Sequence, residues 1–269
     1  MRRSTPSTST RCRAAGSRAG PRYRWRSPDA RARARAADYV SIYLRWDQLG
    51  PEGRREEIRN IINAQLAREG IPPVRVAFSN RAPGSAVFTG ALWTMALSET
   101  SVDGARPSAR DFATLVENAV HETQHTVTTF RGVRIAMERK QFDERSYVRD
   151  DIVEQARAAN RRRSPSRELD QHAQDEAFEI YQLSVASVPK DDSKLSPGQA
   201  RREEVLGRRD AALAALKAAR SESDRERARL AYVAAHNDYM SLPEETFSWR
   251  SGGQAKSAVL ERITLEEQG

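Results

Sequence analysis

Apolar residues recur every three or four positions in the middle of the chain, between Phe112 and Met137. This spacing puts them along one side of an α-helix, so it predicts a long amphipathic helix lying on a core. The apolar stripe consists of Phe112, Leu115, Val116, Ala119, Val120, Val127, Phe130, Val133 and Met137.

Short runs with other patterns precede this helix. Residues 39–46 alternate between apolar and polar side chains, which favours a strand, and residues 51–69 follow a helical pattern that ends at Gly70. Further strands are expected at 74–78, 85–89 and 92–98, with a turn at Gly90-Ala91 joining the last two.

After Lys140 the chain is highly charged and nearly all helical in pattern, with helices expected over 149–162, 168–187, 198–220 and 223–241. The last two are predicted to form an antiparallel hairpin around residues 221–223. The fold class is therefore α+β and predominantly helical, with a small sheet before the long helix and a long C-terminal helical hairpin. The expected hairpin interface places Leu206, Ala212, Leu213 and Leu216 opposite Leu230, Val233 and Ala234.

Residues 1–37 differ in composition from the rest of the chain. They hold 11 arginines and one acid, Asp29, so they contribute +10 to a net charge of +8, and residues 38–269 sum to −2. Rich in Arg, Ser, Pro and Ala, this tail has too few aliphatic residues to bury, and we expect it to be disordered. Residues 38–269 are expected to form one domain, with the sheet and long helix in 38–140 and a helical subdomain in 141–269.

Several classes of protein are excluded by simple features. Cys12 is the only cysteine, so an intrachain disulfide and a thiolate zinc site are both excluded. No apolar run reaches about 20 residues, so no membrane-spanning helix is expected. Arg2-Arg3 is not followed by an apolar segment, so no signal peptide is expected. We expect a bacterial protein that is cytoplasmic in the producing cell or leaves it by a non-classical route.

The most informative motif is His121-Glu122-Thr123-Gln124-His125, an HExxH sequence inside the long helical pattern. Histidines four residues apart lie on the same face of a helix, so both imidazoles can bind one Zn²⁺ ion. Both histidines lie opposite the middle of the apolar stripe, so we expect them to face a cleft. The motif predicts a zinc metallopeptidase in which Glu122 is the general base, taking a proton from a zinc-activated water and passing it to the leaving nitrogen.

A third protein ligand must complete such a site. A metzincin is excluded because Thr128 and Arg131 stand where glycine and histidine are required. We therefore expect a glutamate and favour Glu245, because Pro243 suits the first turn of a helix whose dipole stabilises a carboxylate there. The alternatives are Glu244, Glu176 and Glu144.

Two residues that precede Glu245 in the sequence, His236 and Tyr239, are candidates for stabilising the oxyanion of the reaction. His236 and Tyr239 could each donate a hydrogen bond if the end of the hairpin reaches the cleft, although ordinary packing is the favoured explanation for both. His172 is expected to be a surface residue.

The order of these features resembles the zincin-type metallopeptidase domains of bacterial polymorphic toxins and of cargo proteins of contractile injection systems. The resemblance runs from about Trp46 to Gly253. It rests on Pro72-Pro73-Val74, residues 88–95, Val120 to His125 followed by Phe130-Arg131, Tyr239, Leu242-Pro243-Glu244-Glu245 and Trp249.

This resemblance implies a protein or peptide substrate and delivery by an injection or toxin system. It also implies that Trp93 to Ser98 forms the edge strand beside the cleft. In such enzymes the glutamate ligand often opens an ExxSD run; here Glu245 and Ser248 match, and Trp249 stands in place of the aspartate.

Two other classes of function remain open. The chain could be a zincin-like scaffold that keeps a metal without turnover, or its arginine-rich tail could bind nucleic acid, with the histidine pair incidental.

Overall fold

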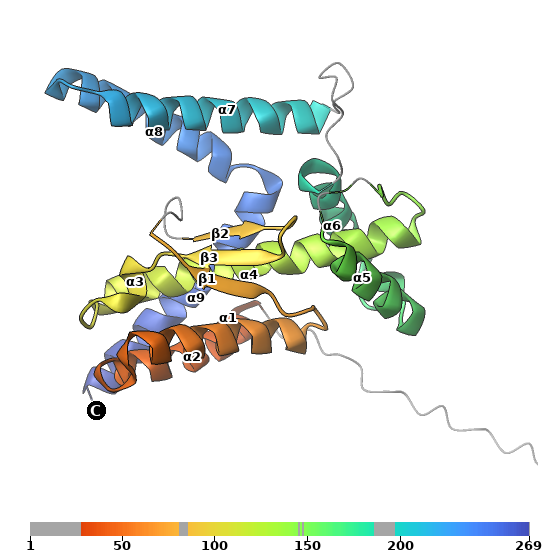
Figure 1. Cartoon of the computed structure of the whole chain (residues 1–269), viewed down its shortest axis with the longest axis horizontal. Coiled ribbons are helices and arrows are strands. Elements are labelled where there is room, and N and C mark those ends of the chain that lie inside the picture. The colour runs from red at the N-terminus through yellow and green to blue at the C-terminus, as the bar shows by residue number, and fades with distance from the viewer. Residues whose placement is uncertain (1–27, 81–85, 145, 147, 186–196, 269) are drawn as a thin grey trace, which may run out of the picture.

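The computed structural model describes residues 28–80, 86–144, 146, 148–185 and 197–268. As expected, the protein is predominantly helical with one small sheet. Figure 1 shows one long helix running through the middle of the molecule, with the sheet, further helices and a projecting helical hairpin arranged around it. None of the helices in the described part of the chain is long and apolar enough to cross a membrane.

The central helix is α4 (Ala109–Glu138), which confirms the helix predicted from the apolar stripe. The Ser108 side chain caps its first turn by accepting a hydrogen bond from the Asp111 N–H. Unlike a helix lying on the surface of a core, α4 is buried on most of its faces. Another helix, α9 (Pro243–Gln268), packs against α4 and brings Glu245 and Trp249 to the histidines.

Helix α9 starts at Pro243, as the sequence suggested, and crosses α4 at very short range. A Cβ atom at Gly252 would lie only 2.7 Å from the backbone oxygen of Glu117 on α4. Beyond this crossing α9 also packs along α1 (Pro28–Leu44), and Ala255, Val259 and Ile263 are completely buried there. Helix α9 thus contributes these three residues to the main hydrophobic core.

The strand predicted at 39–46 is wrong, because these residues belong to α1 and the start of α2 (Trp46–Arg68). Helix α1 contacts both α2 and α9, so it buries apolar side chains on two faces, including Tyr39, Val40, Ile42 and Tyr43. The domain boundary expected at residue 38 consequently falls inside α1. The rest of the predicted tail, residues 1–27 with Cys12, lies outside the described residues.

The sheet has the strand order β1 (Arg75–Phe78), β3 (Thr94–Leu97), β2 (Ala86–Thr89). Strand β3 pairs in parallel with β1 and antiparallel with β2, with Phe88 opposite Met95. Its position in the centre of the sheet contradicts the expectation that Trp93 to Ser98 forms the edge strand. The edge beside α4 is β2, and the short helix α3 (Thr100–Asp103) leads from β3 back to α4.

Two helices and a 3₁₀ turn cover the C-terminal half of α4: α5 (Asp150–Arg162), η1 (Pro165–Arg167) and α6 (Gln171–Ser184). The contact with α6 is close at Gly132, where a Cβ atom would lie 2.6 Å from the backbone oxygen of Ala177 and 2.7 Å from the Cβ of Tyr181. Both helix predictions for this region are confirmed to within a few residues.

Helices α7 (Pro197–Ala218) and α8 (Glu222–Met240) form the predicted antiparallel hairpin, which projects along one side of the molecule (Figure 1). The prediction that Leu230 and Val233 of α8 face α7 is wrong, because both side chains are exposed. The partly buried face of α8 instead carries a row of rings, Tyr232, His236 and Tyr239.

Lys140 ends α4 in a left-handed backbone conformation, with φ at +58°. Its N–H donates to the Met137 oxygen and the Gln141 N–H donates to the Ala136 oxygen, a pairing that usually has glycine at this position. We expect Lys140→Gly to stabilise the protein by about 0.5–1 kcal/mol, because relief of about 1–2 kcal/mol of backbone strain exceeds the extra entropy of the unfolded chain.

Urea unfolding would measure this change. Lys140→Ala is the matched control, since it removes the same side chain but keeps the Cβ, and it should give no comparable gain. Equal stability of the two variants would contradict the assignment of strain to the backbone.

Candidate metal centre

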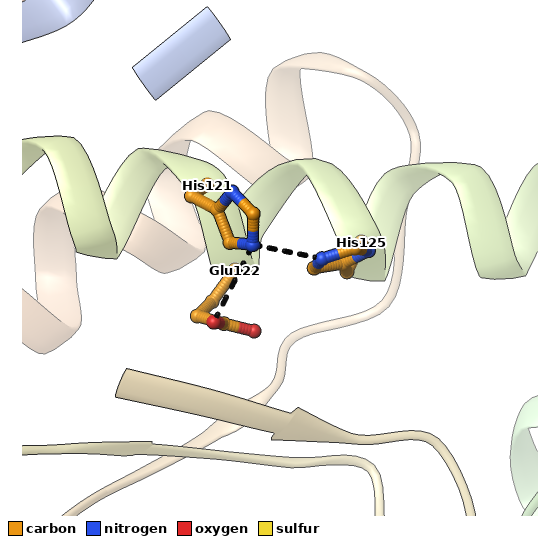
Figure 2. A group of neighbouring side chains, drawn as sticks. All are labelled: His121, Glu122 and His125. Atoms are coloured by element: carbon orange, nitrogen blue, oxygen red, sulfur yellow. Dashed lines mark hydrogen bonds and ion pairs between the residues drawn. The ribbon is translucent and has the colours of Figure 1, made fainter. Parts of the chain in front are cut away.

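The two motif histidines lie together on one side of α4. Their Nε2 atoms are 2.9 Å apart and their rings meet edge to face, with centroids 4.5 Å apart. Figure 2 shows both rings projecting from the helix with these nitrogens turned toward one another. His121 is buried and His125 is slightly more accessible, with 16% of its side chain exposed.

Glu122 extends from the same helix toward the sheet (Figure 2). One carboxylate oxygen, Oε2, accepts a hydrogen bond of 2.7 Å from the backbone N–H of Phe88 on the edge strand β2. The other oxygen, Oε1, lies 3.8 Å from the His121 Nε2. The edge strand therefore holds one oxygen of Glu122 and leaves the other close to the histidine pair.

Glu245 brings a second carboxylate to the histidines from the first turn of α9. Its Oε2 is 3.3 Å from the Nε2 of His121, and its Oε1 is 3.6 Å from the Nε2 of His125. Oε2 is buried and has no well-aligned hydrogen-bond donor. Of the glutamates considered from the sequence, Glu245 is the one that the fold brings to both imidazoles.

The other three glutamates are engaged elsewhere. Glu244 is buried on a different side of α9, where its Oε1 accepts a hydrogen bond of 2.9 Å from Arg202 of α7. Glu144 is exposed and pairs with Arg157. Glu176 lines a surface groove of about 350 Å³ between α6 and α9, together with His172 and Arg250.

His121, Glu122 and His125 lie close enough together to hold a metal ion. Glu245 is the better third ligand than Glu122, because both of its oxygens approach the two ring nitrogens while Glu122 is tied to Phe88. Tetrahedral zinc with bonds of about 2.0–2.1 Å separates its ligand atoms by about 3.3 Å. The distances of 2.9, 3.3 and 3.6 Å between these nitrogen and oxygen atoms bracket that value.

The charges of the site also suit a cation. Glu122 and Glu245 are both buried, and no lysine or arginine in the described ranges pairs with either of them. Buried carboxylates are stable only when a positive group or a metal neutralises them. Among the described residues, the two imidazoles are the only basic side chains that contact these carboxylates, so a divalent ion between them would supply the missing positive charge.

The ionisation of these groups reflects their burial and mutual contacts. Burial raises the pKa of Glu122, against the opposing charges of His125 and His121. Burial would also raise the pKa of Glu245, but its close contacts with His121, His125 and Tyr239 outweigh burial and hold the pKa of this carboxyl well below its usual range. Glu245 is therefore ionised at neutral pH and available as a ligand.

The residues that follow Glu245 contact the far sides of both rings. Ser248 Oγ lies 3.4 Å from the Nδ1 of His125. Trp249 packs on the ring of His121, with centroids 4.2 Å apart and planes at 45°. The Nδ1 of His121 is buried and has no hydrogen-bond partner among the described residues. The ExxS pattern pointed to this stretch, but its contacts could not be placed from the sequence.

The structure separates the two candidates for oxyanion stabilisation. Tyr239 lies beside Glu245, and burial together with this carboxylate raises the pKa of its phenol far above the ordinary value. His236 instead packs between Tyr232 and Tyr239 in the hairpin, with ring centroids 5.6 and 5.9 Å away. Tyr239 thus interacts with the third carboxylate, whereas the contacts of His236 are with the two tyrosine rings.

Comparison with known proteins gives no relative: no family model, curated protein or solved structure matches this chain.

Proposed function

We propose that the protein is a zinc-dependent hydrolase of peptide bonds. The observation that carries the proposal is the convergence of His121, His125 and Glu245, whose ligand atoms lie 2.9–3.6 Å apart, beside a second buried carboxylate on Glu122. These residues would hold the ion, which when bound activates water and polarises the carbonyl of the substrate.

Glu122 then acts as the general base. Its Oε2 is fixed by the Phe88 amide, so Oε1 is the oxygen that takes a proton from the attacking water. The water oxygen bonds to the carbonyl carbon, and the proton passes from Glu122 to the nitrogen of the breaking C–N bond. No covalent enzyme intermediate is needed, because each proton and each bond is accounted for by water, the substrate and Glu122.

Tyr239 positions Glu245 rather than the substrate. Its phenol lies against this carboxylate and stays protonated at neutral pH, so it can donate a hydrogen bond to the ligand. Such a contact orients a metal-binding carboxylate and is part of the site in most metalloenzymes. We assign no chemical role to His236.

The edge strand β2 offers a place for the substrate. Its Phe88 amide contacts the general base, so a peptide paired with other backbone groups of the outer edge of β2 would pass directly beside Glu122. Pairing of this kind recognises the main chain of an extended peptide. We therefore propose a flexible protein segment or peptide as the substrate class.

Zinc content tests the metal site. We expect about one zinc per chain in the purified protein, and a loss of at least tenfold in zinc affinity for His125→Ala and for Glu245→Gln. Glu176→Gln is the matched control, because it makes the same change on the neighbouring helix α6 and should keep its zinc. Metal analysis after dialysis and competition with a chromophoric chelator give both quantities.

Two outcomes would overturn the assignment. Zinc that is absent from the folded wild-type protein after refolding with excess metal would reject the site as a whole. Zinc that is retained by Glu245→Gln at wild-type affinity would reject Glu245 as the third ligand.

One observation favours a second candidate, a protein that holds the metal without turnover. The side chains of Glu122 and Glu245 are only 10% and 8% exposed, so in this structure the site is nearly closed to solvent. A scaffold would bind zinc as expected above but would show no hydrolysis that depends on Glu122.

A further inference from the structure

Trp249 packs directly on His121, one of the candidate metal ligands. It comes from the turn of α9 after Glu245, so one stretch of helix presents a carboxylate, the Ser248 hydroxyl and an indole to the histidine pair. The indole lies against His121 at 4.2 Å between centroids. Because α9 also crosses α4 closely at Gly252, this indole is fixed in place by the helix packing.

The two histidines are held in different ways. A histidine that binds metal through Nε2 usually donates its Nδ1–H to an oxygen, which fixes the orientation of the ring. His125 has the Ser248 hydroxyl near its Nδ1, at 3.4 Å. The Nδ1 of His121 is buried and has no partner in the described part of the chain, and the same is true of the Trp249 Nε1.

Packing against the indole of Trp249 can orient the His121 ring in place of a hydrogen bond to its Nδ1. Aromatic rings in tilted contact at this distance attract one another and restrict rotation about the side-chain bonds. The His121 ring also contacts His125, which it meets edge to face. An aromatic ring at position 249 would therefore keep the Nε2 of His121 directed at the metal.

We infer that Trp249 is a positioning residue of the metal centre, which orients His121 by ring packing where other sites use a hydrogen bond. This inference rests on the proposed zinc site. It requires the aromatic face of Trp249 and does not require its N–H group.

Measuring the zinc affinity of three variants tests whether the aromatic face of Trp249 is needed and its N–H group is not. Trp249→Phe keeps an aromatic face and should bind zinc within about threefold of the wild type. Trp249→Leu and Trp249→Ala remove it and should weaken binding by about 10–100-fold, the range expected when the group that orients a ligand is lost. Competition with a chromophoric chelator at fixed pH measures all four proteins.

A control is needed because Trp249 lies on a helix of the core. Val259→Ala on the same helix removes completely buried methyl groups far along α9 from Glu245, so it should lower thermal stability and leave zinc affinity unchanged. If zinc affinity fell in step with stability across Val259→Ala, Trp249→Leu and Trp249→Ala, the role of Trp249 would be structural only.

Fluorescence gives a second readout. Binding of Co²⁺, which quenches nearby indoles, should lower the tryptophan emission of the wild type, and Trp249→Phe should lose most of that quenching while still binding the ion.

The outcomes distinguish this inference from the proposal beneath it. Wild-type protein that binds neither Zn²⁺ nor Co²⁺ would reject the metal site. Protein that binds both ions but tolerates Trp249→Ala and Trp249→Leu at wild-type affinity would reject the positioning role alone.

Discussion

Replacing Glu122 by glutamine is expected to lower the rate of peptide hydrolysis by about 10²–10⁴-fold while zinc remains bound. The amide has nearly the same shape and its oxygen can still accept the hydrogen bond from the Phe88 N–H, but it cannot take a proton from water. Zinc should remain because His121, His125 and Glu245 are unchanged. Initial rates on unfolded casein and on a quenched fluorescent peptide library, at equal zinc content, measure the effect.

Glu117→Gln provides the matched control for this experiment. Glu117 lies on α4 one turn before His121, and its carboxylate pairs with Lys256 of α9 at 2.6 Å. The control should keep wild-type activity. Hydrolysis that survives unchanged in Glu122→Gln would assign the activity to another residue or to a contaminant, and zinc-loaded wild type without activity would favour the scaffold.

Alanine at Gly132 or Gly252 is expected to destabilise the protein by about 1–3 kcal/mol, although alanine normally favours a helix over glycine by about 1 kcal/mol. The new Cβ would lie 2.6 Å from the Ala177 oxygen in the first case and 2.7 Å from the Glu117 oxygen in the second. Both neighbours are backbone atoms, so the paired helices must move apart. Chemical unfolding of the metal-free proteins measures the change.

Gly207→Ala is the control for these two variants. Gly207 lies within α7, and a Cβ there would meet nothing within 4 Å, so this substitution should stabilise the protein by about 0.5–1 kcal/mol. The two destabilising variants, Gly132→Ala and Gly252→Ala, should also differ in their effect on zinc binding. Gly252→Ala shifts α9 against α4 and should weaken zinc binding, whereas Gly132→Ala lies at the α6 contact and should not. A neutral or stabilising effect at Gly132 and Gly252 would show that the helix contacts are looser than described.

The central helix and the histidine pair could be predicted because their signal is local. Residues four apart on a helix must share a face, and the apolar spacing around His121 fixed the helix. Glu245 was preferred for a similarly local reason, its place two residues after Pro243 at the start of a helix. Its approach to the histidines depends on the hairpin that returns the chain, which the charge pattern and turn residues indicated.

The incorrect predictions for α1 and for the α8 interface have a different cause, which is how the faces of these helices pack against their neighbours. Helix α1 lies between α2 and α9, so apolar residues occur at Tyr39, Val40, Ile42 and Tyr43, and this spread imitates the alternation of a strand. In α8 the face that packs on α7 carries rings, and the aliphatic residues Leu230 and Val233 point outward. Neither arrangement can be read from periodicity alone.

The order of the strands in the sheet and the contacts made by backbone groups could not be predicted from the sequence either. The runs at 85–89 and 92–98 look alike, and only pairing with β1 puts the second of them in the middle of the sheet. The hydrogen bond from the Phe88 N–H to Glu122 leaves no trace in residue types, because every residue except proline has this donor.

Because α9 supplies Glu245 as well as buried residues against α1 and α4, the proposed metal centre can be complete only after that helix has been synthesised. A nascent chain that has folded only its sheet and α4 would carry both imidazoles but no closing carboxylate. Under the proposed function, hydrolysis would therefore begin only once α9 has emerged and docked on α4.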